Sequence, residues 1–136
     1  MYVANVTPFG SAPTSSIDLA AYRHHVGWLA GHGVGGVVPF GTNGEGPSVS
    51  TDEEVGVLET LIGDDLGIQI VPTVAEGNLP DTVALLERVN DLPVTAVLVL
   101  PPWFRCRSPT TSRPPSHGWP GRPAECPAAP VLRAVP

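Results

Sequence analysis

Apolar residues recur along the first hundred positions in two patterns, one typical of buried strands and the other of amphipathic helices. Continuous apolar runs predict four short strands, over residues 2–7, 34–40, 68–74 and 95–100. Between the strands, apolar residues three or four positions apart predict three helices, which begin near Asp18, Ser50 and Pro80. The order βαβαβαβ predicts a parallel sheet with helical crossovers.

Local signals support the last two helices. Ser50 and Glu53 have the spacing of a capping box at a helix start. The same acidic first turn, including Glu54, is explained by the helix dipole, so we assign no catalytic role to it. Pro80 suits the first turn of the third helix, whose predicted apolar face consists of Val83, Leu86 and Val89.

Four strands and three helices amount to roughly half of a (β/α)8 TIM barrel, which needs about 250 residues. The fold class predicted for this chain is therefore α/β, as the N-terminal half of a TIM barrel over residues 1–104. Periodicity ends after Phe104, and residues 105–136 contain eight of the 17 prolines. This Pro/Arg-rich tail is predicted to be disordered.

Charge changes at the same boundary. Residues 1–104 contain twelve acidic residues against two arginines, a net charge of −10, whereas residues 105–136 contain five arginines and one glutamate, a net charge of +4. An acidic first part argues against a nucleic-acid partner. The sequence contains no apolar run of about 18 residues and no signal-like N-terminus. We therefore expect no membrane partner and a cytoplasmic location.

Cysteine and histidine contribute little to the picture. Cys106 and Cys126 both lie in the tail, and without a secretory signal we interpret them as an incidental pair. His24, His25 and His32 have no accompanying cysteine or carboxylate cluster, so neither a metal nor a cofactor is expected.

Residues 41–45, with the sequence GTNGE, form the stretch with the clearest chemical character. They follow the strand over 34–40 and precede the helix that begins at Ser50. A Gly-flanked βα loop lets backbone N–H groups and the Thr42 hydroxyl point at a carboxylate or phosphate. Taken alone, the same spacing also fits a tight turn with an incidental threonine.

Several motifs occur together in one order. They are TPF at 7–9, IDL at 17–19, GTNGE at 41–45, SVSTDEE at 48–54, IVPTV at 70–74 and AVLVLPPWF at 96–104. This set resembles the dihydrodipicolinate synthase / N-acetylneuraminate lyase family of class I aldolase-type lyases, over residues 1 to about 104.

The resemblance implies a TIM barrel in which a 2-keto acid, commonly pyruvate, forms a Schiff base with a lysine on a later strand. By the same match, Thr42 and Asn43 would bind the substrate carboxylate, and Thr42 would join a hydroxyl relay to a tyrosine. Gly41 and Gly44 would shape the loop, and Glu45 would tie it to neighbouring backbone.

The sequence departs from the family pattern at several positions. Asn43 replaces a second threonine, and Phe104, an aromatic residue of the expected pocket, replaces a tyrosine. Pro72 stands in a motif that is usually glycine-rich. Most importantly, all seven basic residues are arginines, so the Schiff-base lysine is absent. Arginine stays protonated and does not form an imine.

Two functions follow as hypotheses. The first is a truncated member of this lyase family that is inactive alone, with a tail translated out of frame from GC-rich coding DNA. The alternative is a non-catalytic half-barrel that pairs with another chain and binds a partner through proline-rich tail segments such as Arg113-Pro114-Pro115. Under either hypothesis, the exposed edges of a half-barrel predict self-association.

Overall fold

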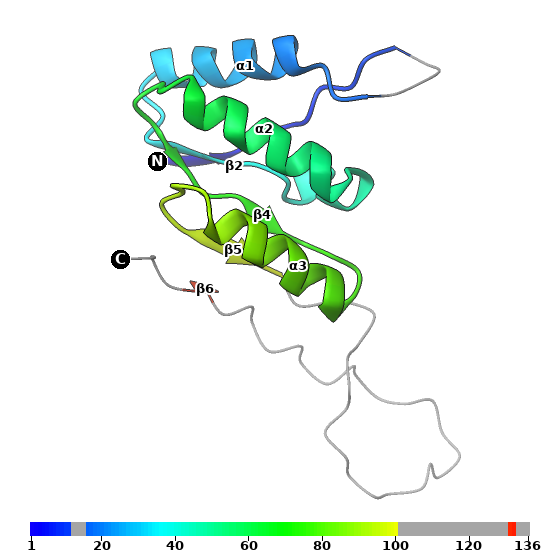
Figure 1. The fold of residues 1–136 in the computed structure, drawn as a ribbon. Helices are drawn as coiled ribbons and strands as arrows, with labels where there is room; N and C mark the ends of the chain where they lie inside the picture. Colours follow the sequence, from blue (N-terminus) through cyan, green and yellow to red (C-terminus); the bar gives the residue numbers. More distant parts are fainter. Residues whose placement is uncertain (12–15, 101–130, 133–136) are drawn as a thin grey trace, which may run out of the picture.

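Three helices and a set of short strands build the part of the chain that the computed structural model describes, residues 1–11, 16–100 and 131–132 (Figure 1). The strands are β1 (Tyr2–Ala4), β2 (Gly36–Val38), β3 (Gln69–Ile70), β4 (Thr73–Val74), β5 (Val97–Val99) and β6 (Val131–Leu132). The helices are α1 (Leu19–Gly31), α2 (Thr51–Gly63) and α3 (Leu79–Asn90), with short 3-10 turns at Thr42–Gly44 and Gly46–Ser48.

Strands β1, β2 and β3 pair in that order, all parallel, and β4 pairs parallel with β5. The alternation of parallel strands and helices that the sequence predicts is thereby confirmed as α/β. The strands are shorter than predicted, since β1 ends at Ala4 rather than Thr7 and β2 covers only the centre of 34–40.

The prediction of one continuous strand over 68–74 needs a correction, because this segment contains two strands in separate sheets. Pro72, which lies between β3 and β4, has no N–H to donate to a ladder. Hydrogen bonds nevertheless continue past it: the N–H groups of Gln69, Val71 and Thr73 donate, at 2.9–3.0 Å, to alternate carbonyls in and beside β2, those of Gly35, Val37 and Pro39. Residues 68–74 thus join the two sheets. Four parallel segments lie side by side in the order β1, β2, β3 with β4, and β5.

Helix starts agree with the sequence signals. The Ser50–Glu53 capping box is confirmed: the Ser50 hydroxyl oxygen accepts from the Glu53 N–H at 3.3 Å, and the Glu53 carboxylate accepts from the Ser50 N–H at 3.1 Å. Pro80 lies in the first turn of α3. The predicted apolar face of α3 is confirmed at Val89, which is buried, and Leu86 packs partly buried against the core. It is wrong at Val83, which is 44% exposed, and the buried face includes Thr82 and Leu85 instead.

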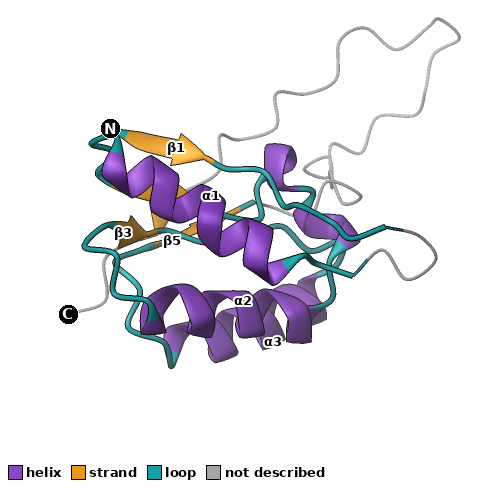
Figure 2. Ribbon diagram, turned by 90° about the horizontal axis from the view of Figure 1, so that it is seen from above, coloured by secondary structure: helices purple, strands orange, loops and turns teal. Residues whose placement is uncertain are grey.

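The two faces of the strands differ in burial. Figure 2 shows the helices as a layer on one side of the strands. Val37, its strand partner Ile70, and Val74 belong to the hydrophobic core together with residues of the helices. On the other face, Tyr2 is 51% exposed and Ala4 is also exposed. In a closed barrel this inner face would be covered, so its exposure fits an open half-barrel. Self-association through the open edge at β1 stays a prediction.

The tail lies mostly outside the described residues. Residues 131–132 form β6, which pairs antiparallel with β5, so the prediction of a tail without structure is wrong at these two positions. Phe104 and the remaining residues of 105–136 lie outside the described part. Within the described residues, no helix is both long and apolar enough to cross a membrane.

Candidate functional site

The loop at 41–45 lies where β2 ends and the chain turns toward α2, the edge at which α/β proteins commonly bind ligands. Its path is sharply bent. Phe40 and Glu45, at its two ends, adopt the left-handed φ values of 61° and 51°, which are unusual for residues with side chains. The Gly41 carbonyl accepts hydrogen bonds from Gly44 N–H at 3.0 Å and Gly46 N–H at 3.4 Å, which closes the loop on itself.

The predicted carboxylate-binding residues differ in their surroundings. Thr42 lines a small pocket of about 210 Å³, whose other lining residues are Glu45, Pro47, Ser48, Ala75 and Leu100. Asn43 is exposed beside it and does not line the pocket. Within the described residues, the N–H groups of Thr42 and Asn43 have no hydrogen-bond acceptor. Among the described residues that line this pocket, none is basic.

Glu45 contributes to the loop through its backbone. Its N–H donates to the Thr42 carbonyl at 3.3 Å, and its own carbonyl accepts from the Ser48 N–H at 2.8 Å. The Glu45 side chain is exposed at the pocket rim. Gly44 is buried, and a methyl group added to it would lie 3.0 Å from the Asn5 carbonyl oxygen. A side chain at position 44 would therefore push the loop away from the segment that follows β1.

A buried polar cluster beneath the loop was not identified from the sequence. Asn5, Thr7 and Tyr22 are 1%, 6% and 0% exposed. The Asn5 amide donates to the Tyr22 phenol oxygen at 2.6 Å, and the Thr7 hydroxyl donates to the Gly44 carbonyl at 2.7 Å. Burial raises the pKa of Tyr22 to about 12, so the phenol stays neutral. Asn5 was the available signal, as a polar residue inside a predicted buried strand.

Glu54 corrects the interpretation of the acidic first turn. The helix dipole and the capping box account for Glu53, but Glu54 is only 3% exposed. Burial, with a smaller contribution from the nearby Glu76 charge, raises the pKa of Glu54 to about 8. Burial also raises the pKa of Glu76, and the negative charge of Asp81 raises it further. Glu54 therefore carries a proton at neutral pH, and the dipole does not explain its position.

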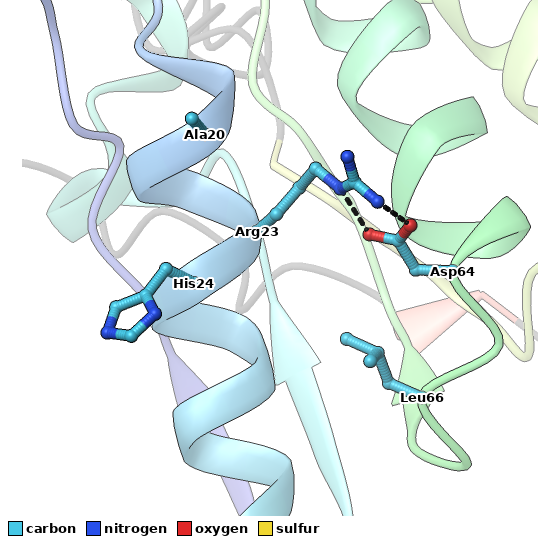
Figure 3. Close-up of a pocket in the computed structure, with 5 residues that line it drawn as sticks. All are labelled: Ala20, Arg23, His24, Asp64 and Leu66. Atoms are coloured by element: carbon cyan, nitrogen blue, oxygen red, sulfur yellow. Dashed lines mark hydrogen bonds and ion pairs between the residues drawn. The ribbon is translucent and has the colours of Figure 1, made fainter.

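A surface depression of about 510 Å³ lies elsewhere, between α1 and the end of α2 (Figure 3). Arg23 reaches across it and donates through Nε to an Asp64 carboxylate oxygen at 2.7 Å, while His24 points away from the pair. Asp64 thus neutralises the charge of Arg23 at this depression. The depression is open and distant from the loop, so we assign no ligand to it.

Groups that could supply metal or covalent chemistry were also considered. Within residues 1–11, 16–100 and 131–132, no three His, Cys, Asp or Glu side chains gather as a metal site would require. The sequence contains no lysine, since all seven basic residues are arginines. What the described site offers is a set of N–H and hydroxyl donors at a strand-to-helix loop.

The described residues combine parallel strands, helices on one side and a Gly-flanked loop at the strand ends, an arrangement typical of α/β barrel proteins. Comparisons with known proteins identify the family within this class. Residues 1–112 match the model of the dihydrodipicolinate synthetase family. The 4-hydroxy-tetrahydrodipicolinate synthase of Nitrobacter hamburgensis is 36% identical over 104 residues, which are 76% of this chain and 34% of that protein.

Solved structures agree with this match. A dihydrodipicolinate synthase from Bacillus anthracis is similar with a TM-score of 0.64 and 27% identity, over 74% of this chain and 34% of that one. The N-acetylneuraminate lyase of Proteus mirabilis gives a TM-score of 0.65 and 26% identity, over 72% of this chain and 33% of that one. The chain belongs to the dihydrodipicolinate synthetase family, and it spans about a third of the length of the relatives it matches.

Proposed function

We propose that these 136 residues supply the carboxylate-binding βα loop of the family's site and do not perform Schiff-base lyase chemistry by themselves. The ligand would be a 2-keto acid such as pyruvate, held at Thr42 and Asn43. The observation that carries the proposal is the loop geometry: Thr42 faces a pocket, and the N–H groups of Thr42 and Asn43 have no acceptor among the described residues.

The chemistry explains why binding and catalysis separate here. An imine requires a neutral primary amine, and the arginine side chain, which stays protonated, does not provide one. Carboxylate binding needs only positioned donors, and the loop offers two N–H groups and a hydroxyl. Because none of the described residues that line the pocket is basic and the pocket is open to water, this binding is expected to be weak.

A titration tests the binding part of the proposal. Pyruvate added to the isotope-labelled chain should shift the amide signals of Thr42 and Asn43, with a dissociation constant of about 1 mM or weaker. Acetone, which has the keto group without the carboxylate, should leave them unchanged. Thr42→Val removes the hydroxyl at nearly constant size and should weaken binding about threefold or more.

Thr95→Val is the matched control, since Thr95 is exposed and belongs to a groove at the opposite ends of the strands. It should leave the pyruvate titration unchanged. Equal shifts with pyruvate and acetone, or shifts that Thr42→Val and Thr95→Val affect equally, would contradict carboxylate binding at this loop.

A further inference from the structure

Tyr22 packs beside the start of the 41–45 loop and is linked to its far end through neighbouring residues, although it lies on α1, about twenty residues away in sequence. Its ring packs against Phe40, which directly precedes the loop, with ring centroids 6.3 Å apart at an interplanar angle of 33°. Both side chains are 0% exposed. The left-handed backbone at Phe40 is therefore held next to a fully buried aromatic contact.

At the other end of the loop, the phenol of Tyr22 acts through two neighbours. Asn5 donates to the phenol oxygen at 2.6 Å. Thr7, two residues further along the same segment, donates to the Gly44 carbonyl at 2.7 Å. The bond to the phenol therefore fixes the segment of residues 5–7, and this segment holds the loop backbone at Gly44.

The loop has a reason to need such support. Non-glycine residues in the left-handed region are strained, and such conformations persist where the surrounding structure fixes them. Phe40 and Glu45 both adopt this region, at φ values of 61° and 51°, on either side of the donors of Thr42 and Asn43. Contacts at both ends of the loop are what would keep these donors in one arrangement.

We propose that Tyr22 is a positioning residue for the 41–45 loop, acting through its ring on Phe40 and through Asn5 and Thr7 on Gly44. It does not touch the ligand itself. The relevance to ligand binding rests on the proposed function of the loop, whereas the positioning of the loop backbone does not.

Amide hydrogen exchange on the full chain tests the proposal. Tyr22→Phe keeps the ring and removes the hydroxyl, and it should accelerate exchange of the Gly44, Glu45 and Gly46 amides about tenfold. These amides donate to Gly41 and Thr42 carbonyls within the loop. Amides in the middle of α2 should accelerate much less. Tyr2→Phe is the matched control, since Tyr2 is half-exposed at the far end of β1.

A second variant separates positioning from general stability. The double variant Tyr22→Phe, Asn5→Leu removes the phenol hydroxyl together with the Asn5 amide that donates to it. No buried amide is then left without its hydrogen-bond acceptor. In this double variant the α2 amides should return to wild-type exchange while the loop amides stay fast. Parallel changes of loop and α2 amides in both variants would overturn the proposal and leave Tyr22 as an ordinary core residue.

A pyruvate titration of Tyr22→Phe completes the test. The shifts at Thr42 and Asn43 should need severalfold more pyruvate than in the wild-type chain. If the wild-type chain binds no pyruvate, the proposed function fails, but accelerated loop exchange in Tyr22→Phe would still support the positioning role.

Discussion

Glu54→Gln is expected to stabilise the folded chain above pH 8 by up to about 4 kcal/mol and to have little effect near pH 4. Burial of Glu54 raises its pKa from 4.5 to about 8 in the folded chain. Between these two pH values the folded state keeps a proton that the unfolded state has released. The free energy of unfolding therefore falls as pH rises through this window, and the full penalty is present above it.

Urea unfolding at pH 5, 7 and 9 measures this effect. The wild-type chain should lose stability steadily across the three values, while Glu54→Gln should lose much less, with the remaining slope from the partly buried Glu76. Glu59→Gln is the control, because Glu59 is exposed on the same helix. An identical slope in the wild-type chain and Glu54→Gln would show that Glu54 is not the buried acid.

Gly46→Ala is expected to destabilise the chain by at least about 3 kcal/mol, through overpacking against a rigid neighbour. A Cβ at this position would lie 2.1 Å from the Phe40 carbonyl oxygen and 2.9 Å from its carbonyl carbon. These are backbone atoms next to a strained φ, so they have little room to yield. The glycine is needed here for close approach of two backbone segments.

Gly56→Ala provides the control for the same measurement, urea unfolding at constant pH. Gly56 lies inside α2, and an added Cβ would meet nothing within 4 Å. This change should raise the free energy of unfolding by about 0.5–1 kcal/mol, because alanine favours the helix. Equal effects of the two substitutions would contradict the described loop geometry.

Features encoded by short sequence spacing were predictable. The Ser50–Glu53 capping box, the proline in the first turn of α3 and the alternation of strands and helices all follow from local chemistry, and the structure confirms each. On α3, Val89 is buried as predicted but Val83 is exposed, because the buried face includes Thr82, a polar residue whose hydroxyl donates to the Asn78 carbonyl at 2.7 Å. Tertiary packing, which sequence periodicity does not specify, decided that rotation.

Features that depend on distant residues were not predictable in the same way. Tyr22 falls within the helix predicted to begin near Asp18, and only the fold brings its hydroxyl to Asn5, seventeen positions earlier in the chain. Glu54 reads as an ordinary first-turn acid until α2 packs and buries it. For the candidate site, sequence and family resemblance located the loop, while the groups that support it came from three-dimensional contacts.

We propose that this chain, although it belongs to the dihydrodipicolinate synthetase family, forms no Schiff base within its own sequence. Incubation with pyruvate, reduction with borohydride and peptide mapping by mass spectrometry test it directly. An enzyme already known to form a Schiff base with pyruvate serves as the positive control. We expect no pyruvyl adduct within the chain, with any trace of labelling confined to the α-amine of Met1. A reduced adduct mapped to any internal residue would contradict it.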